Sequence, residues 1–388
     1  MRFASSISAE QTTEAALEEL FAPIDRRVTP GMVDLVIFFF TNHFRQDAEL
    51  IAERIGTMFP SATVLGCTAD GTIGEDRELE RVPSISLLAG SLPDVVVRPF
   101  HVKEADLADA KTPAHWERLF GVGPESRPAF IALADPFRVP IHGFVDRIND
   151  AFPKAPLLGG VASGAHEPDG NALVLNDSIH TDGIIGVSLS GRFQIQTVVS
   201  QGCRPIGVPL VITKGERNVV HHLGGKPALE QLRHVLESLS EEDEQLARQS
   251  LFVGRVIDEF KPAFARGDFL IHNILGADRK TGSVAIAGHA KIGATVQFHV
   301  RDAASADEDL RTLLTKHAGR DVRGGLLFGC NGRGTNMWPK PGHDVGVVRS
   351  VFPDLPVAGF FCGGEFGPIG DKNFIHGFTA SIALFLER

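Results

Sequence analysis

Apolar runs and helical patterns alternate along this chain, and their order repeats three times. Near-continuous apolar runs at residues 35–40, 130–134 and 326–328 predict buried strands. Each run precedes, in order, a helical segment, a Phe-Pro pair, a second apolar strand, a Gly-rich turn and a third strand. Because three copies share this order, the pattern predicts a repeated supersecondary unit.

The three Phe-Pro pairs are the clearest markers of the repeat: Phe59-Pro60, Phe152-Pro153 and Phe352-Pro353. Proline after the phenylalanine ends the helix and favours extended structure. The first strand glycine, at Gly66, Gly159 and Gly359, falls at the same offset from the pair each time. We therefore expect an α/β fold of repeated strand-helix-strand-Gly turn-strand units that form two mixed-sheet domains.

The third copy carries the most polar chemistry, in the stretch 356–385, PVAGFFCGGEFGPIGDKNFIHGFTASIALF. Cys362, Glu365 and His376 lie among five glycines. A strand that leads into a Gly-rich turn exposes backbone N–H groups and allows close approach of a ligand or another chain. Residues 374–385 predict a closing strand. The alternative interpretation is a tight hairpin in a large sheet.

The remaining patterns outline the other elements. Helices are predicted over 10–26, 227–240 and 304–317, with a further helical stretch docked by Trp116 and Phe120. Strands are predicted over 95–100, 193–203, 208–213, 219–223, 268–277, 283–287 and 295–301. The first residues are polar and become helical around Thr12 or Thr13. The threefold pattern is interrupted after about residue 200, so we place one domain at 1–210 and a second at 211–388.

Composition and charge exclude several classes of protein. The chain has 388 residues, 43% of them hydrophobic and 22% charged, which is typical of a folded globular protein of two or three domains. A net charge of −10 without a basic cluster argues against nucleic acid as a partner. No apolar run is long enough to span a bilayer, and the N-terminus resembles no signal peptide. Cytoplasmic localisation is the resulting prediction, and the four cysteines, without a CxxC pair, indicate neither disulfides nor a zinc site.

Several linked motifs resemble one known family. FGCNGRG at 328–334, GFFCGGEFGPIG at 359–370 and FIHGFTASIALF at 374–385 resemble the C-terminal half of the FIST domain family. LGCTADGTIG at 65–74, LLGGVASG at 157–164 and SQGCRPIG at 200–207 resemble its N-terminal half. The resemblance implies an intracellular sensory module that binds a small ligand such as an amino acid. Some bacterial members bind haem, sense nitric oxide and regulate a histidine kinase, and some eukaryotic members are fused to an F-box.

The Gly-rich turns and their polar neighbours form the predicted ligand site. Backbone N–H groups of the turn glycines and the Arg333 guanidinium suit a carboxylate, while Glu365 suits an ammonium group, a combination that fits an amino-acid-like zwitterion. The alternative is that Arg333 pairs with Glu365 and ties two turns together. The predicted ligand-binding residues are Cys67, Thr68, Gly71, Gly160, Ser163, Cys330, Asn331, Arg333, Cys362, Gly363, Gly364, Glu365 and His376.

The sequence is compatible with two other functions. Haem binding would need an axial His or Cys in an apolar pocket, and the chain supplies 15 histidines and 27 phenylalanines without selecting a ligand. A Cys-dependent hydrolase would use Cys330 or Cys362, but no nucleophile motif is present, so no catalytic residue is predicted. The preferred prediction is a non-enzymatic sensor that signals through a separate partner, such as a histidine kinase.

Overall fold

The computed structural model describes residues 1–109 and 112–387 as a mixed α/β protein with four sheets. The chain forms two compact units. Unit 1 contains residues 1–199, 310–375 and 379–388, and unit 2 contains residues 200–309 and 376–378. None of the described helices is long and apolar enough to cross a membrane.

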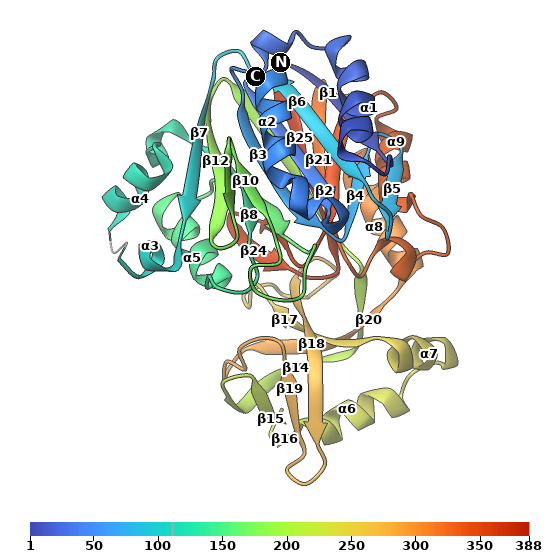
Figure 1. The fold of residues 1–388 in the computed structure, drawn as a ribbon. Helices are drawn as coiled ribbons and strands as arrows, with labels where there is room; N and C mark the ends of the chain where they lie inside the picture. The colour runs from blue at the N-terminus through green and yellow to red at the C-terminus, as the bar shows by residue number, and fades with distance from the viewer. Residues whose placement is uncertain (110–111, 388) are drawn as a thin grey trace. The chain divides into compact units, whose positions relative to one another are not determined.

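Unit 1 consists of three copies of one arrangement of strands and helices (Figure 1). Repeat 1 contains β1 (Arg2–Ser8), α1 (Thr13–Asp25), η1 (Pro30–Met32), β2 (Leu35–Thr41), η2 (Asn42–Asp47), α2 (Ala48–Met58), β3 (Thr63–Ala69), β4 (Gly71–Gly74), β5 (Arg77–Glu80) and β6 (Ile85–Ser91). Repeat 2 contains β7 (Val95–Val102), α3 (Glu104–Asp109), α4 (Pro113–Phe120), η3 (Pro124–Ser126), β8 (Ala129–Ala134), α5 (Ile141–Ala151), β9 (Leu157–Val161), β10 (Leu173–Leu175), β11 (Ser178–His180) and β12 (Ile184–Gly191). Repeat 3 contains β13 (Phe193–Gln201), α8 (Ala303–Thr315), β21 (Val322–Cys330), η4 (Gly334–Asn336), α9 (His343–Val351), β22 (Val357–Cys362), β23 (Glu365–Ile369), β24 (Lys372–His376) and β25 (Thr379–Glu387).

Each repeat builds a six-stranded sheet with the same strand order. The sheets run β1-β6-β2-β3-β10-β11, β7-β12-β8-β9-β23-β24 and β13-β25-β21-β22-β4-β5. The two strands joined by the helix before the Phe-Pro pair are parallel in all three cases. The closing strand of each repeat pairs antiparallel to the first of these strands. The repeated unit predicted from the sequence is therefore present three times.

The outer strands of each sheet come from a different repeat. The hairpin β4–β5 of repeat 1 extends the sheet of repeat 3, through β22. The hairpin β10–β11 of repeat 2 extends the sheet of repeat 1, and β23–β24 of repeat 3 extends that of repeat 2. The exchange is cyclic, so each repeat completes the sheet of another. The two chain ends also meet, since the Met1 ammonium lies 3.2 Å from a Glu387 carboxylate oxygen (Figure 1).

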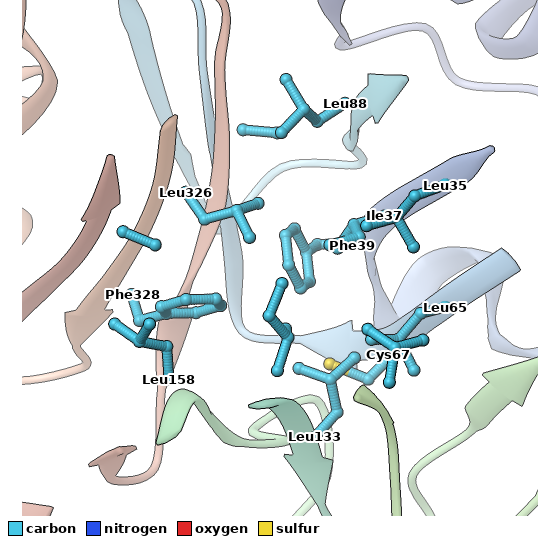
Figure 2. Close-up of a cluster of buried hydrophobic side chains, with 14 of the residues drawn as sticks. Leu35, Ile37, Phe39, Leu65, Cys67, Leu88, Leu133, Leu158, Leu326 and Phe328 are labelled. Atoms are coloured by element: carbon cyan, nitrogen blue, oxygen red, sulfur yellow. The ribbon is translucent and has the colours of Figure 1, made fainter. Parts of the chain in front are cut away.

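The three sheets share an inner core and each has an outer helical layer. Helices α1 and α2, α4 and α5, and α8 and α9 cover the outer faces of the three sheets in turn. The inner faces meet in one apolar cluster, to which β2, β3, β8 and β21 contribute Phe39, Cys67, Leu133 and Phe328 (Figure 2). The central strands are buried on both faces, which explains why their sequences are continuous apolar runs.

The Phe-Pro pairs end helices as the sequence predicts. Phe59, Phe152 and Phe352 follow the last residues of α2, α5 and α9, and each backbone N–H donates to the carbonyl four residues earlier. All three rings are buried. The repeated Phe therefore both closes the helix and anchors it to the sheet, while the following proline directs the chain into the next strand.

Unit 2 is a curved antiparallel sheet with two helices. It contains β14 (Cys203–Glu216), β15 (Val219–Leu223), β16 (Lys226–Pro227), α6 (Ala228–Glu237), α7 (Glu241–Gln249), β17 (Leu251–Val256), β18 (Phe269–Asp278), β19 (Ser283–Ile286) and β20 (Thr295–Arg301). The strand order is β14-β20-β17-β18-β19-β15-β16, and β14 also pairs with β15, so the sheet closes on itself. Its core includes Leu232 and Val235 of α6.

One element differs from its sequence prediction, and two others had no sequence prediction. The first residues form the buried strand β1, because its serine hydroxyls find partners, such as the Val357 N–H that donates to Ser5 Oγ at 3.1 Å. The single strand predicted over 374–385 is two strands, β24 and β25, which a positive φ at Phe378 separates. The acidic stretch at Glu241 begins helix α7, with Ser240 as its N-cap. The domain division at 210/211 stays a prediction, since the compact units follow a different division of the chain.

Candidate functional site

Most of the predicted ligand residues of repeat 3 gather where β21 and β22 end. Cys330 and Cys362 are the last residues of these parallel strands and are register partners. The Asn331 N–H donates to the Cys362 carbonyl at 3.0 Å. Glu365 begins β23 and pairs with Gly160 of β9. The site therefore lies at the carboxyl edge of a parallel strand pair, where open α/β sheets commonly bind ligands.

Glu365 is a fully buried carboxyl group at the centre of this cluster. Its Oε2 accepts hydrogen bonds from Thr379, from Oγ1 at 2.8 Å and from the backbone N–H at 3.3 Å. Oε1 has no nitrogen or oxygen partner among the described residues. Burial raises the pKa of Glu365 to about 8, because it outweighs the lowering effects of Thr379, Arg333 and the Cys330 thiol. The group is therefore mostly neutral at pH 7.

Arg333 is also fully buried, and its partner is Asp344. Nε and Nη2 donate to the two Asp344 carboxylate oxygens at 2.6 and 2.8 Å. Burial favours the neutral form of Asp344, but the Arg333 charge and hydrogen bonds prevail and lower the pKa of Asp344 to about 2. The alternative prediction, an ion pair between Arg333 and Glu365, is wrong, because the first turn of α9 supplies the carboxylate. The Nη1 group has no hydrogen-bond partner within the described chain.

Residues 331–342, which we name the β21–α9 loop, are held by stacking and by acidic side chains. The Arg333 guanidinium lies 4.9 Å from the Trp338 ring, which stacks on His343 at 3.6 Å. Glu78 of β5 accepts hydrogen bonds from the N–H groups of Val345 and Gly342, at 2.9 and 3.1 Å. Glu80 accepts two further hydrogen bonds from the N–H and the hydroxyl of Thr335. The hairpin of repeat 1 thus anchors the loop of repeat 3.

Two of the thiols in this cluster, those of Cys67 and Cys362, are buried and protonated. Burial raises the pKa of Cys67 and of Cys362, and the nearby Glu365 raises that of Cys362 further. A Cβ at Gly160 would lie 2.4 Å from the Cys362 sulfur, so Gly160 is the residue that makes room for this thiol. A nucleophilic cysteine needs a lowered pKa and access to substrate. Cys67 and Cys362 instead have the surroundings of small apolar core residues.

Thr68 and Ser163 connect the repeats. The Thr68 hydroxyl donates to Asn171 Oδ1 at 3.0 Å, from repeat 1 to repeat 2. The Ser163 hydroxyl donates to the Phe361 carbonyl of repeat 3 at 2.5 Å and accepts from the Asp70 N–H of repeat 1 at 3.0 Å. One hydroxyl in repeat 2 therefore joins all three repeats. Both hydroxyl groups already have hydrogen-bond partners within the protein, and the role of Thr68 and Ser163 as ligand contacts stays a prediction.

The turn glycines allow backbone segments to approach closely. The Gly363 N–H donates to the Val161 carbonyl at 3.0 Å, and the Gly364 carbonyl accepts from the Val161 N–H at 2.8 Å. A Cβ at Gly71 would lie 2.7 Å from the Leu79 carbonyl oxygen. A carboxylate that binds the Gly363 N–H would have to replace its present partner. His376 ends β24 and belongs to unit 2.

Three buried polar atoms in this cluster have no nitrogen or oxygen partner in the described residues: Asn331 Oδ1, Arg333 Nη1 and Glu365 Oε1. All three residues belong to the set predicted from the sequence. Glu78, Asp344 and Thr379 were not predicted from the sequence. In residues 77–80, RELE, two glutamates alternate with other residues, a pattern typical of an exposed edge strand. Asp344 lies in the first turn of a helix, where an aspartate is expected simply because it stabilises the helix dipole.

Two family models match nearly the whole chain. The FIST N domain matches residues 34–226, and the FIST C domain matches residues 228–368. The chain belongs to the FIST domain family. Glu78 and Ser163 lie in the part that matches the FIST N domain, whereas Cys330, Arg333 and Glu365 lie in the part that matches the FIST C domain.

Relatives of this FIST protein include bacterial and plant chains. The uncharacterized protein Rv0628c of Mycobacterium tuberculosis is 34% identical over 394 residues, which cover 100% of both chains. The uncharacterized protein Mb0898c of Mycobacterium bovis is 36% identical over 349 residues, 89% of this chain and 88% of the relative. The F-box/LRR-repeat protein At5g63520 of Arabidopsis thaliana is 27% identical over 225 residues, 54% of this chain and 41% of the relative.

The buried Glu365 carboxyl makes the stability of the FIST protein depend on pH. Its pKa is raised from 4.5 to about 8 on folding, so between these values the unfolded chain releases a proton that the folded protein retains. The free energy of unfolding therefore falls as pH rises across this window. We expect Glu365→Gln to remove this loss, so that between pH 6 and pH 8.5 the free energy of unfolding of the variant rises relative to that of wild type by about 2–3 kcal/mol. Urea unfolding at pH 6 and pH 8.5 measures the difference.

The matched control for this prediction is Glu49→Gln, on the exposed surface of α2. It should leave the pH profile of stability unchanged. Glu78, with a pKa raised to about 7 by burial and then by Asp344, contributes a further decline of the same sign that both variants retain. Parallel pH profiles for wild type and Glu365→Gln would contradict the assignment of a raised pKa to Glu365.

Proposed function

We propose that this FIST protein is a sensory module that binds a small zwitterion, such as an amino acid, at the cluster around Glu365 and Arg333. The observation that carries the proposal is the set of three buried polar atoms that have no nitrogen or oxygen partner among the described residues. Buried donors and acceptors in folded proteins almost always have partners, and each one left without a partner costs about 1–3 kcal/mol. Three such atoms in one cluster support a site that a ligand completes.

The chemistry of these atoms matches a zwitterion. Arg333 Nη1 can donate a hydrogen bond to a ligand carboxylate, while Nε and Nη2 donate to Asp344. Glu365 Oε1 and Asn331 Oδ1 are acceptors for an ammonium group. An ammonium group beside Glu365 would favour its ionised form. Binding at pH 7 should therefore release a proton and should strengthen as pH rises towards 8.

The β21–α9 loop is the proposed transmitter of the signal. Arg333 and Glu365 are fully buried, so a ligand can enter only when part of the surrounding chain moves, and this loop carries Arg333. The loop is tied to β5 by Glu78 and to α9 by the stacking of Trp338 on His343. A ligand that binds one loop position better than the other shifts the population of the two. We propose that a separate signalling protein, such as a histidine kinase, recognises this change.

The other predicted functions fit this cluster less well. A haem would need space and an iron ligand, but the Cys362 sulfur fills the space at Gly160 and its thiol is kept protonated. The residues of this cluster therefore do not fit a haem, and haem binding elsewhere in the chain stays a prediction of the family resemblance. The raised pKa of Cys362 likewise supports a non-enzymatic role for that thiol. Its replacement by serine would test the hydrolase alternative.

The proposal predicts measurable binding of a free amino acid. In a calorimetric screen of the twenty amino acids, at least one should bind, raise the melting temperature and alter Trp338 fluorescence. Glu365→Gln should weaken that binding by about tenfold or more, because a charged hydrogen bond contributes about 1.5–3 kcal/mol. Glu49→Gln should bind like wild type. Titrations in buffers of different ionisation enthalpy should reveal proton release in the wild type only.

Two results would contradict the proposed site. Binding of an amino acid with equal affinity to wild type and Glu365→Gln would place the ligand elsewhere. Failure of all twenty amino acids to bind, with intact folding by circular dichroism, would remove the zwitterion as the ligand class.

A further inference from the structure

A second site is indicated at the opposite, amino-terminal ends of the strands of repeat 3. A cavity of about 610 Å³ opens where the start of β21 and the Phe352-Pro353 turn meet the first residues of β1. Four arginines line it: Arg2, Arg27, Arg320 and Arg323. Asp354 is the one acidic residue among the described residues that line it. This local excess of positive charge contrasts with the net charge of −10 of the whole chain.

Three of the four guanidinium groups have no partner in the part of the chain that the structure describes. Arg323 pairs with Asp321 at 2.6 Å and lies 3.9 Å from Glu387. Within residues 1–109 and 112–387, no hydrogen bond or ion pair is recorded for the side chains of Arg2, Arg27 or Arg320. Burial lowers the pKa of neighbouring His317, and the positive charges of Arg320 and Lys316 lower it further.

The walls of the cavity are apolar. Phe352 and Leu355 are buried beneath it, and Val322 and Val351 are half-buried at its side. A second cavity of about 440 Å³ is also lined by Arg2 and Arg323. The volume is that of sites for small organic molecules, which are typically lined by apolar groups with a few convergent polar ones. Inorganic ions need no such wall.

The position of the cavity follows from the threefold repeat. It lies where the Phe-Pro turn of repeat 3 meets the first strand of repeat 1. The corresponding place between repeats 2 and 3 also contains a cavity, of about 440 Å³, lined by the Phe152-Pro153 turn and the start of β13. That cavity has two basic residues, Arg127 and Lys154. The hollow is thus a feature of the repeat, and the arginine cluster is particular to the join between repeats 3 and 1.

We infer that the arginine-lined cavity binds a phosphorylated organic molecule of nucleotide size. A guanidinium group matches the geometry of phosphate oxygens with two parallel hydrogen bonds. The three guanidinium groups without a partner among the described residues can together bind a group that carries several negative charges, such as a polyphosphate. The apolar wall suits the uncharged part of the same molecule. This site is separate from the Glu365 cluster, so the inference does not depend on the zwitterion proposal.

Titration calorimetry with adenosine triphosphate, adenosine and inorganic tripolyphosphate, in about 0.15 M salt, tests the inference. We expect adenosine triphosphate to bind and adenosine not to bind. The double variant Arg2→Gln/Arg320→Gln should weaken binding by about tenfold or more. The control Arg54→Gln/Arg147→Gln removes the same charge from exposed helix positions in α2 and α5, and it should bind like wild type. Glu365→Gln should also leave this binding unchanged.

Each other outcome overturns part or all of the inference. Absence of binding by adenosine triphosphate, or equal losses in the two double variants, would reduce the cluster to exposed surface charge. Binding of adenosine alone would place the site elsewhere. Equal affinity for tripolyphosphate and adenosine triphosphate would overturn the assignment of an organic ligand, because the apolar wall would then contribute nothing.

Discussion

Gly359→Ala is expected to destabilise unit 1 by about 3 kcal/mol or more. A Cβ at this position would lie 1.8 Å from the Leu327 carbonyl oxygen, a backbone atom of the neighbouring parallel strand that no side-chain rotation can move. Gly159→Ala should be as harmful, because its Cβ would lie 1.9 Å from the Ala132 carbonyl oxygen and its φ is +128°. Urea unfolding followed by tryptophan fluorescence reports on unit 1, since Trp116 and Trp338 both belong to it.

The series of strand glycines provides the controls for this experiment. Gly363→Ala should be tolerated, because the nearest atom to its Cβ would be a Val161 side-chain carbon at 3.7 Å. Gly66→Ala should have an intermediate effect, since its Cβ would meet the Phe38 ring, at 2.4 Å, and a side chain can shift where a backbone cannot. Equal stabilities across the series would contradict the close strand contacts at Gly159 and Gly359.

Arg333→Met is expected to destabilise the protein by about 3–5 kcal/mol, because it leaves the buried Asp344 carboxylate without its partner. Glu78 would then face Asp344 without the opposing charge, which adds repulsion between two buried acids. The double variant Arg333→Met/Asp344→Leu should recover most of the lost stability, since replacing a whole buried ion pair by apolar groups is often neutral. Urea unfolding of both variants at pH 7 gives the two values.

The matched control for the ion pair is Arg349→Met on α9, the helix that carries Asp344. Arg349 is half-buried, and its guanidinium donates to the backbone carbonyls of Glu75 at 2.7 Å and Pro353 at 2.5 Å but to no carboxylate of the described residues. We expect a smaller loss, of about 1–2 kcal/mol. If Arg333→Met were no worse than Arg349→Met, or if the double variant were no better than the single one, the buried pair would not be the source of the stability.

The repeat itself was predictable from local signals. Phe59, Phe152 and Phe352 end their helices because proline follows each of them, which is a property of the chain within a few residues. The parallel pairing of the flanking strands follows from the connection by a helix, which requires a crossover. Strand β1 was missed because its sequence, RFASSIS, is half polar, and its serines are compatible with burial only when distant groups accept and donate hydrogen bonds.

The members of the candidate site were also partly predictable. Glu365 and Asn331 stand out as polar residues at the ends of apolar strands, and both retain an unpaired buried oxygen. The partner of Arg333 was not predictable from the sequence. Glu365 and Asp344 both lie within about thirty residues of Arg333, so the chain could fold to place either carboxylate beside its guanidinium. The loop anchors Glu78 and Glu80 are more than two hundred residues away, and only the transfer of the β4–β5 hairpin to the sheet of repeat 3 brings them there.

The sequence alone therefore determined three copies of a strand-helix-strand unit, the Phe-Pro pairs that end their helices, and the family. These features depend on proline geometry, glycine freedom and apolar periodicity, all of which act over a few residues. The tertiary structure decided which sheet each hairpin completes, which carboxylate neutralises Arg333 and which arginines converge between repeats 3 and 1. Those outcomes depend on contacts between segments far apart in the chain, whose energies arise only when burial removes water from them.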